Sequence, residues 1–96
     1  SLWSSLTAAL GLGEKGAAIE VRDITGTVER VGTRQALVRL TAPVPGMLSV
    51  FTWDEGDGKS IAGIRAYLFS ADAAAYARRE EPAWQAWLEG LAAHAD

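Results

Sequence analysis

Two alternating runs flank an acidic, glycine-rich turn in residues 47–69, MLSVFTWDEGDGKSIAGIRAYLF. A period of two is typical of a β-strand, because successive side chains point to opposite faces of the sheet. Residues 54–58, DEGDG, have the composition of a hairpin turn. The stretch therefore predicts two antiparallel strands, residues 47–53 and 60–69, joined by a hairpin.

The same period continues upstream. Ile19 and Val21 alternate with charged residues, residues 25–31 follow in the same style, and residues 36–41 alternate again. Gly26 predicts a bulge or a bend. Together with the hairpin, these segments predict an antiparallel meander of four or five strands.

Helices are predicted at both ends of the chain. Apolar residues recur at helical spacing in residues 2–10, and Gly11 would end that helix. Towards the C-terminus, Ser70 is a good N-cap, and residues 71–79 are rich in alanine, the strongest helix former.

Pro82 interrupts this second helical stretch. It removes a backbone donor and crowds a carbonyl one turn earlier, so we expect a kink or a new helix that starts there. An apolar stripe at i, i+3, i+4 and i+7 follows, made of Trp84, Trp87, Leu88 and Leu91. Residues 1–96 are therefore predicted to be one α+β domain, with a short N-terminal helix, a meander, and a long kinked C-terminal helix packed on the sheet.

The composition argues against several classes of protein. The chain has 96 residues, a net charge of −3 and no cysteine, which excludes disulfides and thiolate metal sites and fits a cytoplasmic location. Arg78-Arg79 is the one basic pair, so we expect no nucleic acid partner. A membrane helix needs about 20 consecutive apolar residues, and no apolar run approaches this length. We therefore expect no membrane partner.

No motif points to a cofactor, a metal or a catalytic residue. Residues 56–60, GDGKS, end like a phosphate-binding loop, but Trp53 stands where its first glycine belongs, so we interpret them as a β-turn. The carboxylates of residues 54–57 do not follow the spacing of a calcium loop. His94 is the single histidine, it lies near the C-terminus, and it has no nucleophile nearby in sequence.

One acidic residue leaves an enzymatic alternative open. In a straight helix, Glu80 would project on the side of Trp84, and a carboxylate on an apolar face is a candidate acid. Otherwise it faces solvent or pairs with Arg65 or Arg78. A cyclase or isomerase that uses Glu80 or Asp57 is therefore a third hypothesis, and the sequence leans towards a protein that is not an enzyme.

A candidate ligand site combines Trp53, Arg65, Tyr67 and Trp84. We predict that Trp53 and Tyr67, on strands joined by the hairpin, are neighbours, and that Arg65 shares the face of Tyr67. An arginine between aromatic rings can hold an anionic or aromatic ligand by hydrogen bonding and stacking. The alternative is that the rings fill the core while the charged end of Arg65 reaches solvent.

The second half of the chain resembles a known superfamily. Residues 65–69, RAYLF, close the run of strands, an alanine-rich helix follows, and residues 84–91 read WQAWLEGL. Over about residues 46–92 this resembles the C-terminal part of the START-like, helix-grip (SRPBCC) superfamily, and within it the branch related to activators of the chaperone ATPase. The resemblance implies an apolar or aromatic small molecule held between sheet and helix, and it implies no shared catalytic residue. A full helix-grip domain is longer, so the chain would be a partial or reduced version.

Two functions follow as expectations. The first is a domain that is not an enzyme and grips a hydrophobic small molecule between the sheet and the long helix. The second is a homodimerisation or protein-interaction module without a small-molecule ligand, in which the sheet face or the stripe of residues 84–91 is the interface. The two are compatible, because a second subunit can complete a missing cavity wall.

Overall fold

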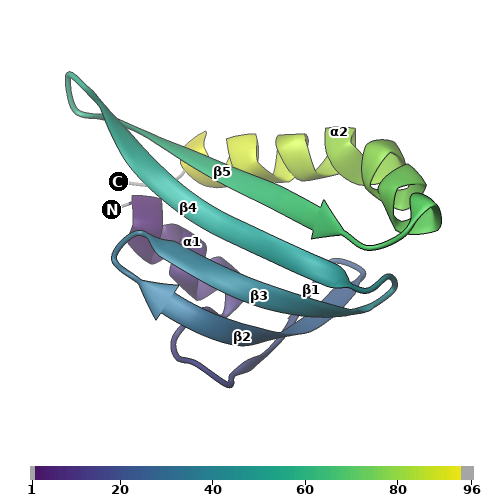
Figure 1. Ribbon diagram of the computed structural model, residues 1–96. Coiled ribbons are helices and arrows are strands. Elements are labelled where there is room, and N and C mark those ends of the chain that lie inside the picture. Colours follow the sequence, from purple (N-terminus) through teal and green to yellow (C-terminus); the bar gives the residue numbers. More distant parts are fainter. Residues whose placement is uncertain (1, 94–96) are drawn as a thin grey trace.

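The computed structural model describes residues 2–93 and has the predicted α+β architecture (Figure 1). Its elements, in chain order, are α1 (Leu2–Leu10), β1 (Ala18–Val21), β2 (Ile24–Gly32), β3 (Gln35–Ala42), β4 (Gly46–Gly56), β5 (Lys59–Leu68) and α2 (Ala71–Ala93). The strands form one sheet in the order β1-β2-β3-β4-β5, and every neighbouring pair is antiparallel. The prediction of a short helix, a meander and a C-terminal helix on the sheet is confirmed.

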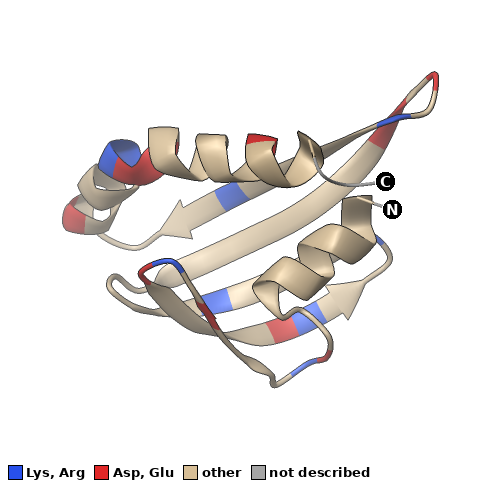
Figure 2. Ribbon diagram, turned by 180° about the vertical axis from the view of Figure 1, so that it is seen from behind, with Lys and Arg blue, Asp and Glu red and all other residues tan. Residues whose placement is uncertain are grey.

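Both helices cover the same face of the sheet, which we call the inner face (Figure 1). The core lies between the helices and this face of the sheet. It consists of Leu6, Leu10, Leu12, Ile19, Val21, Ile24, Val28, Ala36, Val38, Leu40, Leu48 and Val50. Figure 2 shows that α1 carries no charged residue and that most charges of α2 lie in its first half. The opposite face, which we call the outer face, is covered by neither helix.

The turn between β1 and β2 was missed by sequence reasoning. Val21 pairs with Ile24, so the turn consists of Arg22 and Asp23 alone. Arg22 has a φ of 55°, in the left-handed region. Hairpin turns of this kind favour Gly or Asn, and an Arg-Asp pair lacks that signature. The position of this turn matters for the site, because its residues contact α2.

Gly26 marks a bulge, as predicted. The register between β2 and β3 shifts between Thr25 and Gly26. A Cβ at Gly26 would lie 2.4 Å from the carbonyl oxygen of Arg39, closer than any side chain tolerates. Glycine is required here because the neighbouring backbone passes directly over it.

Helix α2 runs without interruption through Pro82, so it is one helix and not two. The N–H of Ala73 donates to the Oγ of Ser70 at 3.1 Å, which confirms Ser70 as the N-cap. Figures 1 and 2 show the first turns inclined to the rest of the helix. Pro82 cannot donate to the carbonyl of Arg78, which accounts for a bend in this part of the helix. Within residues 2–93, neither helix is long and apolar enough to cross a bilayer.

Candidate functional site

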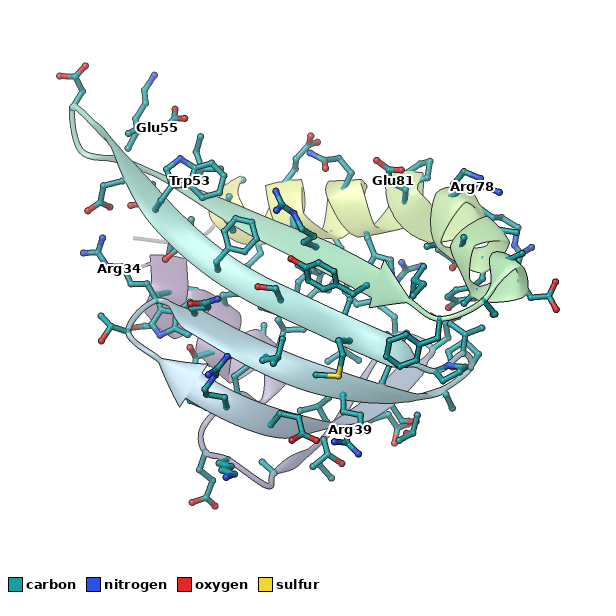
Figure 3. All side chains as sticks on the ribbon, in the orientation of Figure 1. Arg34, Arg39, Trp53, Glu55, Arg78 and Glu81 are labelled. Carbon is teal, nitrogen blue, oxygen red and sulfur yellow. The ribbon has the colours of Figure 1, made fainter. Side chains whose placement is uncertain are left out.

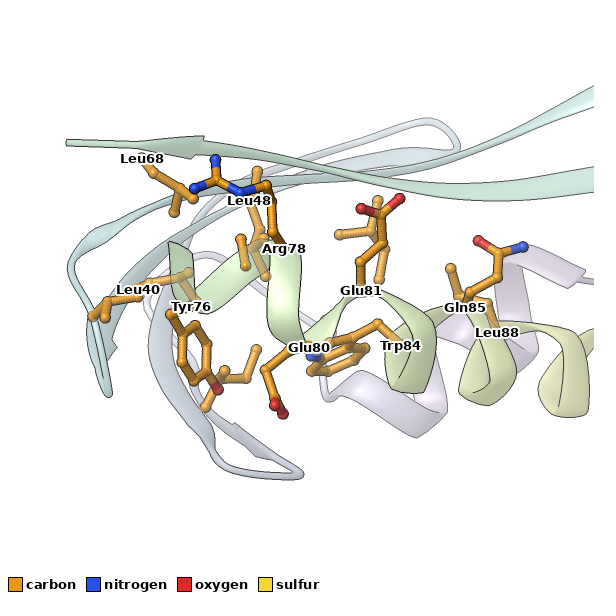
Figure 4. A pocket seen from close by; sticks show the side chains of 15 residues that line it. Leu40, Leu48, Leu68, Tyr76, Arg78, Glu80, Glu81, Trp84, Gln85 and Leu88 are labelled. Carbon is orange, nitrogen blue, oxygen red and sulfur yellow. The ribbon is translucent and has the colours of Figure 1, made fainter. Parts of the chain in front are cut away.

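A cavity of about 300 Å³ lies between the inner face of the sheet and α2 (Figure 4). Its floor comes from the sheet and from the loop before β4, and consists of Ile24, Leu40, Val44, Leu48, Ile64, Ala66 and Leu68. Its roof comes from α2, and consists of Tyr76, Ala77, Arg78, Glu80, Glu81, Trp84, Gln85 and Leu88. The site is therefore an apolar groove with polar side chains along the helix.

The groove is open because α2 does not close against β5. Ile64 and Leu68 point towards α2 but are only half-buried, and Ala66 between them is exposed. Trp84 and Leu88 on the helix are half-buried as well. Protein interiors are packed as densely as organic crystals, so five apolar side chains left partly exposed to solvent between two elements mark a space that residues 2–93 do not fill.

One rim of the groove is formed by the β1–β2 turn. The guanidinium of Arg22 lies over the ring of Trp84, 5.1 Å from its centroid, and its Nη2 is 3.9 Å from Oε1 of Glu80. The hydroxyl of Tyr76 donates a short hydrogen bond to the carboxylate of Asp23. The turn that the sequence did not reveal thus holds α2 in place over the sheet.

The pKa of Tyr76 is raised to about 12. Partial burial of the phenol is the largest cause, followed by its hydrogen bond to Asp23 and by the negative charges of Asp23 and Glu80. Arg22 opposes the shift. Tyr76 is consequently a neutral donor at the edge of the groove at any physiological pH.

The other rim faces β5. Figure 4 shows the side chains of Arg78, Glu81 and Gln85 extending from α2 towards the strand. Gln85 donates to Glu89 at 3.2 Å, while within residues 2–93 Arg78 and Glu81 form no ion pair. This rim offers a cationic donor, an anionic acceptor and an amide to the polar end of a molecule in the groove.

The structure does not bring the four predicted ligand residues together. Trp84 lines the groove, but Trp53, Arg65 and Tyr67 lie on the outer face, on the far side of the sheet. Figure 3 shows Trp53 on the side of the sheet turned away from both helices. A site between sheet and helix therefore contains only Trp84 of the four.

Trp53 and Tyr67 are also not neighbours. Trp53 pairs with Ile61 and Tyr67 pairs with Met47, so six residues of strand (67 − 61) separate them. At roughly 3.3 Å per residue this is about 20 Å. The prediction placed them together because the hairpin joins their strands, but they stand at opposite ends of it.

Sequence reasoning missed Tyr76 as a groove residue. Tyr76, Glu80, Trp84 and Leu88 follow one another at steps of four along α2 and all line the groove. This spacing was visible in the sequence, because residues four apart share a face of a helix. The predicted apolar stripe began only at Trp84, after the kink or new helix expected at Pro82.

The remaining sequence motifs have structural roles. Residues 56–60 form the turn into β5, as predicted. Asp54 accepts hydrogen bonds from Arg34 at 2.6 Å and from Ser60 at 2.9 Å, and the hydrogen bond from Arg34 is the main reason that its pKa is lowered. Glu80 pairs with Arg22 and not with the expected arginines. Within residues 2–93 no three acidic or histidine side chains gather to hold a metal, and His94 lies outside these residues.

A second hollow, of about 390 Å³, lies where α1 meets the hairpin ends. Its lining includes Trp3, Thr52 and the Arg34–Asp54–Ser60 cluster. The polar groups of this cluster already bond one another, so the hollow offers fewer free groups than the groove. The groove under α2 is the stronger candidate.

Comparison with protein-family models, curated proteins and solved structures found no match to this chain.

Proposed function

We propose that this protein is a non-enzymatic binding protein that holds a hydrophobic or aromatic small molecule in the groove between α2 and the sheet. The observation that carries the proposal is the set of half-buried apolar side chains, Ile64, Leu68, Trp84 and Leu88, around a cavity of about 300 Å³. Small-molecule sites are typically apolar clefts of about 300–1,000 Å³ with a few polar groups. The groove lies at the lower end of that range, which favours a small ligand with a few aromatic rings or one medium-length acyl chain.

The polar rim suggests how a ligand would be oriented. Its apolar body would lie along Ile64, Ala66 and Leu68, and its polar end would meet Arg78 or Gln85 at the mouth. The ring of Trp84 offers an aromatic surface, and Arg22 lies over that ring. A ligand would bury apolar surface that the free protein leaves wet, at roughly 25 cal/mol per Å².

The arrangement of a meander sheet under a long C-terminal helix also supports a START-like relationship, which we retain as part of the proposal. A groove between sheet and closing helix is where that resemblance implies a ligand. The proposal involves no cofactor, because the groove residues supply only shape, stacking and hydrogen bonds. We take the cytoplasm as the compartment, on the cysteine-free composition.

A fluorescent apolar probe tests the proposal. We expect N-phenyl-1-naphthylamine to gain emission with the wild-type protein, and decanoic acid to displace it. Ala66→Leu fills the groove from an exposed position and is expected to weaken probe binding at least ten-fold.

Two control variants define the outcome. Ala86→Leu adds the same bulk at an exposed position of α2 that does not line the groove, and Trp53→Gln changes the outer face. Both should bind the probe as the wild type does. Absence of binding by the wild type, or equal binding by Ala66→Leu, would overturn the proposal.

A further inference from the structure

The outer face of β4 and β5 carries a row of large side chains that neither helix covers. Trp53, Tyr67 and Phe69 have 42%, 48% and 69% of their surface exposed. Phe51 stacks on Trp53 with ring centroids 5.4 Å apart, and its ring lies over Gly63, where a Cβ would come within 2.7 Å of it. The face is therefore an ordered aromatic surface and not a set of scattered residues.

The composition of this face is that of a protein–protein interface. Besides the aromatic residues it presents Met47 and Arg65, and protein interfaces are enriched in Trp, Tyr, Phe, Met and Arg and depleted in Lys, Glu and Asp. Glu29 is the carboxylate on this side of β2, and it is bound to Arg39 at 2.7 Å. Arg65 lies at the middle of the aromatic row and forms no ion pair within residues 2–93.

The strand register makes the face complementary to itself. Val50 pairs with Ile64, and this pair marks the middle of the patch along the strands. Phe51 and Trp53 lie one and three residues to one side of it. Ser49 and Met47 lie one and three residues to the other side. A twofold axis running across the strands at this level carries the first pair onto the second. Trp53 of one copy then meets the Met47 and Tyr67 level of the other, which allows aromatic and sulfur–aromatic contacts.

The same axis gives Arg65 a partner. Ser49 pairs with Arg65, and Phe51 pairs with Gly63, so the rotation brings Phe51 of one copy over Ser49 and Arg65 of the other. The small Ser49 leaves room for the ring, and the guanidinium can lie against it as a cation–π contact. Phe51 of each copy faces Ser49 of the other, so the same contact is made twice, which is the isologous arrangement of a twofold dimer.

Charge and area are compatible with a second copy. The chain has a net charge of −3. The acidic residues of α2 lie on the inner side of the sheet, because α2 covers the inner face. Two outer faces would therefore meet with few carboxylates between them. The strands are 4 to 11 residues long and about 4.8 Å apart, and they present a face of roughly 700 Å². One side of a standard interface buries about 600–1,000 Å², so the face falls within that range.

We infer that the protein forms a twofold homodimer through the outer faces of its sheets, with Phe51 and Arg65 beside the axis and Trp53 and Tyr67 further out on either side. Two such sheets would pack face to face about 10 Å apart, as in a β-sandwich. The grooves would open on the two outer sides of the dimer, so dimerisation and ligand binding are independent of each other.

Sedimentation equilibrium across the micromolar to submillimolar range tests the inference. The wild type is expected to be a dimer. Trp53→Gln and Phe69→Ser change exposed side chains, so they should leave the fold intact, and each is expected to raise the dimer dissociation constant at least ten-fold. Arg65→Glu should do the same, whereas Lys15→Glu, an identical charge change at a remote exposed position, should not.

A wild type that stays monomeric at submillimolar concentration overturns the inference, and so does a dimer that none of the three outer-face variants weakens. Circular dichroism of each variant confirms that a monomeric variant is folded. Trp53→Gln and Phe69→Ser come from opposite ends of the patch, so loss of one variant through misfolding leaves the other to decide.

Discussion

Arg22 lies over Trp84, with its guanidinium carbon 5.1 Å from the ring centroid. This contact joins the two-residue turn between β1 and β2 to the middle of α2, across a separation of 62 residues (84 − 22). It involves Trp84, the one side chain of the predicted site that lines the groove. The roof of the groove therefore depends on a turn 62 residues away in the chain.

Removing this contact should loosen α2. We expect Arg22→Gln to lower the free energy of unfolding by about 1 kcal/mol, because it removes a cation–π contact and a partly exposed ion pair with Glu80. Gln and Arg suffer the same strain at the positive φ of this position, so the comparison isolates the side chain. Urea denaturation measures the change. Arg30→Gln, at an exposed position of β2, is the control, and an equal loss there would contradict the role given to Arg22.

Stability should fall at high pH because of Tyr76. Its pKa is about 12 in the fold against an ordinary value of 10, so the fold favours the neutral phenol. That contribution is complete below pH 10 and is lost as the pH rises from 10 through 12. Tyr76→Phe should therefore cost about 1 kcal/mol at pH 8 and flatten this part of the pH profile, as measured by thermal unfolding. A flat wild-type profile would count against the Tyr76–Asp23 hydrogen bond.

The two helices should differ in how tightly they pack. Leu6 of α1 is fully buried, whereas Leu88 of α2 is half-buried beside the groove. We expect Leu6→Ala to cost about 2–5 kcal/mol and Leu88→Ala only about 1 kcal/mol. Chemical denaturation of both variants checks this ratio. Equal costs would mean that α2 closes on the sheet in solution and that the groove is not open.

Two glycines should respond in opposite directions to the same change. Gly26→Ala brings a Cβ within 2.4 Å of a carbonyl oxygen of β3 and should destabilise the fold by about 2–3 kcal/mol. Gly90→Ala meets no atom within 4 Å and lies inside α2, so it should stabilise the fold by up to about 1 kcal/mol. Thermal unfolding of the pair gives both signs in one experiment, and a neutral Gly26→Ala would refute the close approach at the bulge.

Much of the fold was predictable because local patterns agree with it. The alternation in β3, β4 and β5 gave the correct division of side chains between the two faces, and the helical spacing of residues 2–10 matches α1. Ser70 acts as the expected cap, and Gly26 marks the expected bulge. Each of these depends on residues close in sequence, where periodicity and turn chemistry are reliable guides.

Which of the two sheet faces the helices cover was harder to predict. This choice determines which side chains can line a site between sheet and helix. In β4 the larger aromatic residues, Phe51 and Trp53, lie on the outer face, so that face resembled the core. The sheet buries the other face because β2 and β3 offer most of their apolar residues there, with Leu37 of β3 as an exception on the outer face. Their outer positions carry Glu29, Arg30 and Arg39, which cannot be buried without partners. Which face is buried depends on the side chains of all five strands and on the register between them. The alternation within one strand does not reveal it.

The four tryptophans supply the most direct test of the central claim, that the groove under α2 binds an apolar small molecule. Their indole N–H signals can be followed separately by ¹⁵N–¹H correlation spectroscopy while decanoic acid is added. The account predicts that the Trp84 signal shifts and saturates, while that of Trp53, on the opposite face of the sheet, stays in place. A shift at Trp53 without one at Trp84, or no saturable shift at either, would contradict it.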